Sequence, residues 1–149
     1  MSSMAYRYMS SSEIEVVVVD KWNIDDIVEL YRSVNWWKTD SDNSIIPRLI
    51  KNSYVFAVAK YKKTNKAIGM GRVLSDGISD AYIQDVVVLE KWRNKGVGKD
   101  IIQTLLRFCL VNRIEWIALI SEPHQEGFYI PLGFQVMKEY IPMKYIVKK

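Results

Sequence analysis

The spacing of apolar residues changes along this chain, and each change predicts an element. β-Branched residues follow one another in EIEVVVV (13–19), which predicts a strand. Over residues 23–34 the apolar positions recur every three to four residues, which predicts a helix with Asn23 as its N-cap. A second, short helix is expected around Pro47. YVFAVAKY (54–61) and KAIGMGRVLS (66–75), separated by a turn, predict a β-hairpin.

The second half of the chain is expected to contain a strand, a helix and a strand in succession. Residues 81–90 include an unbroken run of valines and a leucine, and a strand that is apolar on both faces is typical of a sheet covered on both sides. An amphipathic helix is predicted over residues 97–110, and EWIALIS (115–121) predicts another apolar strand. This spacing predicts that the two strands pair in parallel through a right-handed crossover.

Two further elements are expected before the chain ends. PHQEGFYIPLGF (123–134) predicts a short helix that ends at Gly133, because glycine is common just past a helix C-terminus. FQVMKEYIPMKYIVK (134–148) predicts two final strands. The complete expected order is βααβββαβαββ.

The composition is that of an ordinary globular domain. The 149 residues are 49% hydrophobic and 26% charged, so we expect one domain over residues 13–149 after a disordered, Ser-rich tail over residues 1–12. Apolar stretches are too short for a membrane span, and the N-terminus does not resemble a signal peptide. We therefore expect a cytoplasmic protein that does not bind membranes. Cys109 is the single cysteine, which excludes an internal disulfide, and its place among leucines predicts a core residue.

The net charge of +4 raises the question of a polyanionic partner. Lysine and arginine are scattered rather than gathered in a stripe, and the densest cluster, KYKKTNK (60–66), is expected to be a solvated hairpin tip. Nucleic-acid binding is therefore not expected. A modest positive field also suits a small polyanionic ligand.

A glycine-rich, cationic turn, RNKGVGKD (93–100), connects the central strand to the amphipathic helix. Such a turn presents free N–H groups at the positive end of the helix dipole, which is a phosphate site. Glycine lets the backbone approach the phosphate closely. The nucleotide-triphosphate loop does not match, because Arg93 stands where its first glycine belongs and Asp100 follows Lys99. The dinucleotide fingerprint fails at Ile101.

The turn and its flanks resemble another pattern. VVVLEKWRNKGVGKDII (86–102) resembles the [RQ]-x-x-G-x-[GA] signature of the Gcn5-related N-acetyltransferase (GNAT) superfamily, which follows an apolar strand. GFYIPLGF (127–134) resembles that family's "lYeklGF" segment. The close resemblance covers roughly residues 81–134. It implies an α/β (α+β) fold with a mixed, mostly antiparallel central sheet, helices on both faces and a splayed pair of parallel strands.

The resemblance implies acetyl-CoA as the co-substrate and no metal. The pyrophosphate would bind the N–H groups of residues 93–98, and the pantetheine arm would run beside the preceding strand. The implied cofactor contacts are Val86, Val87, Val88, Arg93, Asn94, Lys95, Gly96, Val97, Gly98, Lys99 and Tyr129. Two positions depart from the family pattern: Glu122 replaces a common asparagine, and Glu90 replaces a common proline.

The implied chemistry is attack of a neutral amine on the thioester. The resemblance assigns the oxyanion to a backbone N–H near Val86 or Val87, and assigns protonation of the leaving thiolate to Tyr129. The base stays open. Asp85 points to the opposite face by strand alternation unless a bulge redirects it, Glu122 follows the next strand, and a chain of waters is an equal alternative. His124, the only histidine, is expected to be a solvated loop residue.

The acceptor pocket is expected where the family builds it, after the first helix and along the central strand. Its candidate residues are Tyr31, Trp36, Trp37, Tyr82 and Gln84. Tyr82 and Gln84 stand where relatives often carry a base, but neither can act as one at neutral pH. The expected partner is a small-molecule amine. Two alternatives remain open: acetylation of a protein lysine or N-terminus, and a non-catalytic acetyl-CoA-binding module. A homodimer is also open.

Overall fold

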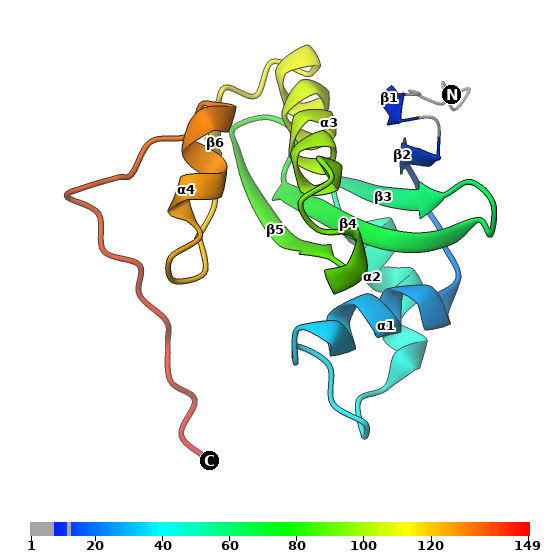
Figure 1. Ribbon diagram of the computed structural model, residues 1–149. Helices are drawn as coiled ribbons and strands as arrows, with labels where there is room; N and C mark the ends of the chain where they lie inside the picture. Colours follow the sequence, from blue (N-terminus) through cyan, green and yellow to red (C-terminus); the bar gives the residue numbers. More distant parts are fainter. Residues whose placement is uncertain (1–7, 12) are drawn as a thin grey trace. The chain divides into compact units, whose positions relative to one another are not determined.

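The computed structural model describes residues 8–11 and 13–149 (Figure 1). Contacts within the chain divide it into two compact units, residues 1–118 and residues 119–149, and each is described by itself. The single domain expected over 13–149 therefore stays a prediction. Most of the disordered tail expected over residues 1–12 lies outside the described residues, and residues 8–11 of it form a strand.

The first unit is built on a mixed sheet of six strands in the order β1-β2-β3-β4-β5-β6. The strands are β1 (Tyr8–Ser11), β2 (Ile14–Val18), β3 (Val55–Tyr61), β4 (Lys66–Ser75), β5 (Asp80–Val88) and β6 (Trp116–Ala118). Neighbours pair antiparallel from β1 to β5, and β5 pairs with β6 in parallel. The predicted mixed, mostly antiparallel sheet is confirmed. The strand expected over 115–121 is shorter than predicted, because β6 has only three residues.

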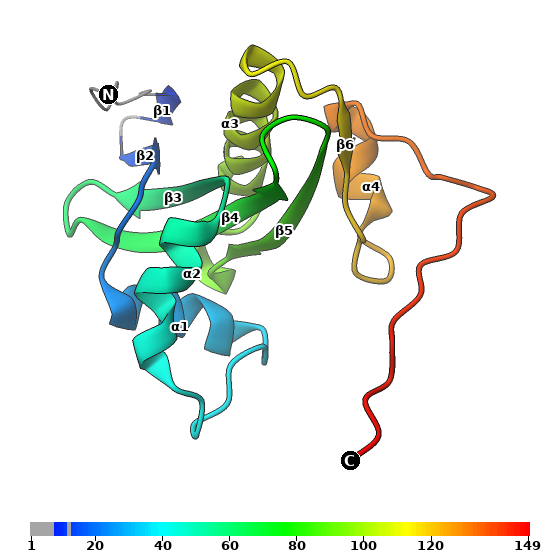
Figure 2. The ribbon, with the colours of Figure 1, turned by 180° about the vertical axis from the view of Figure 1, so that it is seen from behind.

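Helices cover both faces of this sheet, as predicted (Figures 1 and 2). α1 (Ile24–Ser33), the 3-10 turn η1 (Asn43–Ile45) and α2 (Ile46–Asn52) lie on one side, and α3 (Val97–Val111) lies on the other. The core between α1, α2 and the sheet contains Ile27, Leu30, Ile46, Ile50, Phe56, Val58 and Met70. Because side chains alternate along a strand, the neighbouring residues of the same strands point to the opposite face of the sheet, toward α3.

Glycines on β4 allow α3 to lie close to the sheet. A Cβ built on Gly71 would stand 2.8 Å from Cγ2 of Ile101 and 3.1 Å from Cδ1 of Leu105. A Cβ on Gly69 would stand 3.0 Å from Cδ1 of Ile101. Because real Cβ contacts are rarely so short, any side chain at Gly71 would push α3 away from β4.

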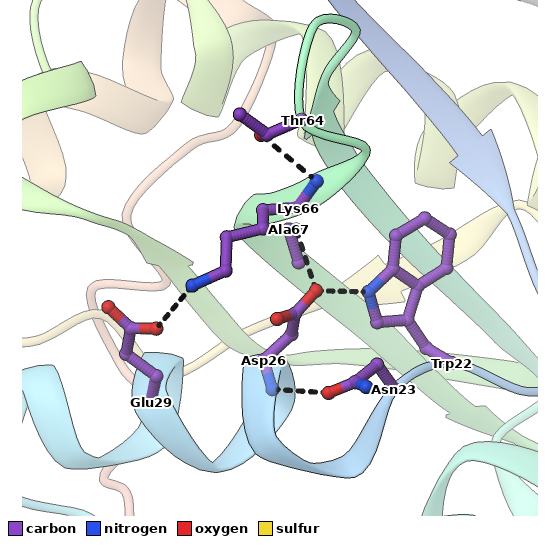
Figure 3. A network of polar contacts seen from close by, with 7 residues as sticks. All are labelled: Trp22, Asn23, Asp26, Glu29, Thr64, Lys66 and Ala67. Carbon is purple, nitrogen blue, oxygen red and sulfur yellow. Dashed lines mark hydrogen bonds and ion pairs between the residues drawn. The ribbon is translucent and has the colours of Figure 1, made fainter.

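A carboxylate network fastens the first turn of α1 to the start of β4 (Figure 3). The side chain of Asn23 accepts the N–H of Asp26 at 3.1 Å, which is the predicted N-cap. Oδ2 of Asp26 accepts both Nε1 of Trp22 at 3.0 Å and the backbone N–H of Ala67 at 3.1 Å. Asp26 is buried, and its two donors supply the hydrogen bonds that a buried carboxylate needs.

The second unit contains α4 (Glu126–Tyr129) and the 3-10 turn η3 (Ile130–Leu132). Gly133 follows with φ of +100°, so the predicted helix end is confirmed. The two final strands predicted over 134–148 are wrong, because this stretch forms neither helix nor strand. Its large apolar side chains are exposed, Tyr145 by 85% and Met143 by 91%. Alternating apolar residues specify a strand only when a partner strand supplies its hydrogen bonds, and an isolated hairpin is marginal in water.

Within the described residues, helix length and apolarity fall short of what a membrane crossing requires.

Candidate functional site

The glycine turn begins at the 3-10 turn η2 (Glu90–Trp92) and ends where α3 starts. Asn94 has φ of +59° and Gly96 has φ of +80°, both in the left-handed region. Glycine is the default residue at such a position because it has no Cβ. A Cβ built on Gly96 would meet no atom within 4 Å, so the space above the turn is open. The backbone conformation, rather than crowding, accounts for the glycine.

The N-terminus of α3 is not capped by a side chain, whereas that of α1 is capped by Asn23. The first N–H groups of α3 therefore have no side-chain acceptor at the helix cap. α3 has 15 residues, and its dipole makes this end attractive to an anion. Arg93, Lys95 and Lys99 are exposed around the turn. The combination is suited to a phosphate group.

Two contacts fix the turn to the sheet. Nε of Arg93 donates to the backbone carbonyl of Val88 at 2.9 Å. The ring of Trp92 lies 4.9 Å, between centroids, from that of Tyr61 at the end of β3. The ammonium groups of Lys91 and Lys95 lie 5.5 and 5.8 Å from the Trp92 ring. The cationic turn is thus attached to the ends of β5 and β3.

The edge of β5 next to the turn has no partner strand on one side. β6 pairs with β5 only from Asp80↔Trp116 to Tyr82↔Ala118. Beyond this point, residues 83–88 pair with β4 on one side, and the described chain places no strand on the other. The gap is what a splayed pair of parallel strands leaves, and backbone groups along it can pair with an extended ligand.

A β-bulge interrupts β5 at this edge. Arg72 pairs with Gln84 and Met70 pairs with Val87, so Asp85 and Val86 together lie opposite Gly71. Asp85 has φ of +56°, a conformation that aspartate tolerates better than most residues. Simple alternation would direct Asp85 toward α3, and the bulge instead directs it toward α1. The sequence alone left open whether a bulge redirects Asp85, and the structure shows that it does.

The carboxylate of Asp85 is held by two donors from other elements. The hydroxyl of Tyr31 on α1 donates to Oδ2 at 2.7 Å, and Nε of Arg72 on β4 donates to the same oxygen at 2.6 Å. Arg72 also reaches Oγ of Ser53 at 3.4 Å. Burial, followed by the charge of Asp85, raises the pKa of Tyr31 above its usual range. The phenol therefore remains a neutral donor.

Aromatic side chains line the face of the sheet on which α1 lies. Tyr31 is 5.5 Å from Trp37 between ring centroids, and Nε1 of Trp37 donates to Oδ1 of Asn43 at 2.8 Å. Trp36 is 42% exposed. Tyr82 on β5 makes an edge-to-face contact with Trp116 of β6 at 5.5 Å. The expected acceptor residues Tyr31 and Trp37 thus lie together.

Gln84, the remaining expected acceptor residue, is exposed on β5 opposite Arg72. Sequence reasoning missed Arg72 and Trp116. For Arg72 a signal existed, because a lone arginine within the apolar strand 66–75 requires a partner. For Trp116 the signal is weaker, because the sequence does not indicate which residue a tryptophan at the start of a strand will contact.

Two expected catalytic residues lie in the second unit. The ring of Tyr129 is 4.9 Å from that of Phe128 and 5.7 Å from that of Phe134. Burial, and then the nearby charge of Glu122, raise the pKa of Tyr129. Glu122 itself is exposed. His124 is exposed with φ of +65°.

Within residues 8–11 and 13–149, no three His, Cys, Asp or Glu side chains lie close enough together to hold a metal ion. Cys109 is fully buried on α3, as predicted, and burial raises its pKa to about 11.

Comparison with known proteins gives a consistent assignment. Residues 30–147 match the model of the acetyltransferase (GNAT) domain. "GCN5-related N-acetyltransferase 1, chloroplastic" of Arabidopsis thaliana is 32% identical over 112 residues, which are 75% of this chain and 56% of that protein. "Histone acetyltransferase TAP1" of Glycine max is 30% identical over 128 residues, 80% of this chain and 54% of that protein.

Solved structures share the fold. Glucosamine-6-phosphate N-acetyltransferase from Arabidopsis thaliana superposes with a TM-score of 0.71 at 19% identity, covering 89% of this chain and 99% of that one. The chain spans little more than half the length of the two curated relatives described above. The match over residues 30–147 and the identity to those relatives show that this chain belongs to the GNAT acetyltransferase family.

Proposed function

We propose that this protein binds acetyl-CoA and transfers its acetyl group to the primary amine of a small molecule. The observation that carries the proposal is the uncapped glycine turn at the start of α3 beside the unpaired edge of β5. One surface offers N–H groups and positive charge to a pyrophosphate, and the adjoining surface offers backbone groups to an extended arm. Family membership supplies the ligand that has both parts.

In this proposal the N–H groups of residues 93–98 hold the pyrophosphate, with Arg93, Lys95 and Lys99 adding charge. Backbone groups of residues 86–88 hold the pantetheine arm, and an N–H near Val86 or Val87 faces the thioester oxygen. Such a fixed donor stabilises negative charge as it develops on that oxygen. The proposed transfer is written without a metal.

The transfer forms a C–N bond and breaks the C–S bond. The amine must lose its proton, which passes to water or to a carboxylate, and Glu122 and Asp85 are the two that the sequence suggests. Tyr129 supplies a hydrogen bond, and then a proton, to the departing sulfur. Because a thiol is a stronger acid than a phenol, full proton transfer is uphill, and stabilisation of the thiolate by the hydroxyl is the larger effect.

A small acceptor is favoured by the aromatic residues at the end of α1, where the half-buried Trp37 lies against the buried Tyr31 and offers a surface for an apolar or aromatic amine. A protein acceptor is the second candidate, because one relative that matches 80% of this chain is named a histone acetyltransferase. A non-catalytic acetyl-CoA-binding module remains a third. Cytoplasmic localisation and a homodimer stay predictions, and the name of one relative assigns that protein to the chloroplast.

The test is release of CoA thiol from acetyl-CoA in the presence of an amine panel. The panel contains small alkyl and aromatic amines, a lysine-containing peptide and a peptide with a free N-terminus and blocked lysine. Mass spectrometry of the products identifies which amine has gained an acetyl group. Acetylation of small amines supports the proposal, acetylation of peptides alone supports the second candidate, and binding without any acetylated product supports the third.

A further inference from the structure

The carboxylate of Asp85 connects three elements that are far apart in the sequence. Its Oδ2 accepts the hydroxyl of Tyr31 from α1 and Nε of Arg72 from β4, while Asp85 itself belongs to β5. The Arg72 side chain is 15% exposed and that of Asp85 is 22% exposed. A charge-assisted pair with this little exposure is ordered and weakly screened.

The same residue occupies the strained position of the bulge. With φ of +56°, Asp85 adopts a conformation that L-residues disfavour, and such conformations persist where surrounding contacts hold them. Removing the bulge would turn Asp85 toward Ile101 and Leu105, where a carboxylate has no donor. It would also reverse the faces of Val86 and Val87, because a shift of one residue exchanges the two sides of a strand.

The bulge immediately precedes the segment whose backbone the proposed function requires. Residues 86–88 follow Asp85 directly and lie along the edge that β6 leaves unpaired. The direction of their N–H groups is set by the backbone conformation at Asp85. A device that fixes φ at Asp85 therefore fixes the hydrogen-bonding edge.

We propose that Tyr31, Asp85 and Arg72 form a clamp that holds the β5 bulge and so orients the edge of residues 86–88 toward acetyl-CoA. This inference rests on the proposed function for its ligand. Asp85 acts in it as a positioning residue rather than as the base, because a proton taken by either oxygen would remove the negative charge that holds Arg72. The raised pKa of Tyr31 keeps its hydroxyl a donor throughout the neutral range.

The clamp is tested by variants that release one contact at a time. Tyr31→Phe removes a hydroxyl and keeps the ring against Trp37, and Asp85→Asn removes a charge but keeps a residue that tolerates positive φ. Each variant is expected to weaken acetyl-CoA binding about tenfold. This is the size of effect expected when a charge-assisted hydrogen bond is lost and the whole loss falls on the binding free energy. The loss in the double variant should be smaller than the sum of the two single losses, because Tyr31 and Asp85 act on the same contact. The KM for acetyl-CoA should rise accordingly.

Asp26→Asn is the matched control. Oδ2 of Asp26 also accepts two donors and also ties α1 to β4, but at the other end of the helix, at Ala67 (Figure 3). It should lower the melting temperature and leave the affinity for acetyl-CoA unchanged. Asp85→Gly is a second control, because glycine adopts the bulge conformation freely but cannot bind Arg72. Wild-type affinity in Asp85→Gly would overturn the clamp by showing that the backbone alone orients the edge.

Amide hydrogen exchange of the protein without ligand separates this inference from the proposed function. Exchange over residues 83–89 should accelerate in Tyr31→Phe and Asp85→Asn, and should stay at the wild-type rate in Asp26→Asn. If the wild-type protein does not bind acetyl-CoA, the proposed function is contradicted, but amide exchange can still test the clamp. Unchanged amide exchange in both Tyr31→Phe and Asp85→Asn would overturn the clamp. A second pattern would also overturn the clamp: Asp85→Asn binds acetyl-CoA with wild-type affinity but turns over about a hundredfold more slowly, while Tyr31→Phe has normal activity. That pattern is expected if Asp85 is the catalytic base.

Discussion

Arg93 donates from Nε to the backbone carbonyl of Val88, with 2.9 Å between the two atoms. This contact joins the last residue of β5 to the cationic turn that precedes α3. It ties the edge proposed for the pantetheine arm to the loop proposed for the pyrophosphate. A single side chain thus sets the distance between two parts of the same proposed ligand site.

Reversing this charge should weaken acetyl-CoA binding. Arg93→Glu removes the bond to Val88 and places a carboxylate beside the pyrophosphate. At low ionic strength we expect a loss of about ten- to thirtyfold in affinity, as expected for reversing an exposed charge near a phosphate. The loss should shrink as salt is added, because screening acts on exposed charges.

Lys51→Glu on α2 is the matched control for Arg93→Glu. It makes the same change in net charge on the opposite face of the sheet from α3, and titration at two salt concentrations should give the wild-type affinity. An Arg93→Glu protein that binds like Lys51→Glu at low salt would remove Arg93 from the site.

Replacing the hydroxyl of Tyr129 should slow turnover and spare binding. Tyr129→Phe keeps the ring between Phe128 and Phe134, so affinity for acetyl-CoA should hold. Turnover should fall roughly 10²-fold, at the lower end for a lost general acid, because a thiolate leaves readily. Tyr140→Phe, which removes a hydroxyl from a 72% exposed side chain of the same unit, should retain full turnover.

The pH profile gives Tyr129 a second signature. Burial and the charge of Glu122 raise its pKa, so the phenol stays protonated through neutral pH and ionises only above its ordinary value of about 10. The contribution of the hydroxyl to turnover should therefore be present at pH 7–9 and be lost as the pH rises through the raised pKa of Tyr129. Wild-type turnover in Tyr129→Phe, measured where chemistry limits the rate, would contradict the assignment.

Cys109 should be chemically inert in the folded protein. It is fully buried, and a pKa of about 11 leaves roughly one thiolate in a thousand at pH 8. A disulfide reagent added at pH 8 should react slowly with the native protein and stoichiometrically after unfolding in guanidinium chloride. Cys109→Ala should keep normal turnover. Rapid native labelling that acetyl-CoA prevents would instead identify a site cysteine.

Local signals in the sequence predicted most of the first unit. β4 has the predicted bounds 66–75, and α3 begins at the predicted residue, Val97. Asn23 caps α1 as expected, because an N-cap depends only on its neighbours in the chain. The glycine turn was recognisable for the same reason: its motif, its charge and its place before a helix are all local.

Features that depend on distant partners were not predictable. Tyr31 and Asp85 are 54 residues apart, and their contact exists only because a bulge turns Asp85 to the α1 side. Residue pattern alone does not encode an extra residue in a strand. The final strands were predicted wrongly because a strand is completed by its neighbour, which alternation within 134–148 does not supply.

Binding of the acetyl-CoA pyrophosphate by the glycine turn is tested most directly with a matched pair of glycine variants. Gly96 has φ of +80° and Gly77 has φ of +79°, so alanine strains the backbone equally at both, by about 1–2 kcal/mol. Gly77 lies in the turn before β5, at the opposite end of that strand from Val88. An alanine there also presses on Tyr54, at 3.0 Å from Cε2, so Gly77→Ala should be at least as destabilised.

The deciding measurement is calorimetric titration of acetyl-CoA into wild type, Gly77→Ala and Gly96→Ala. At Gly96 the new Cβ projects into open space, where only a ligand can meet it. We predict that wild type and Gly77→Ala bind with similar affinity and that Gly96→Ala binds at least tenfold more weakly, a difference of about 1.4 kcal/mol. Equal affinity in Gly96→Ala and Gly77→Ala, with both proteins folded, would show that the glycine turn does not hold the pyrophosphate.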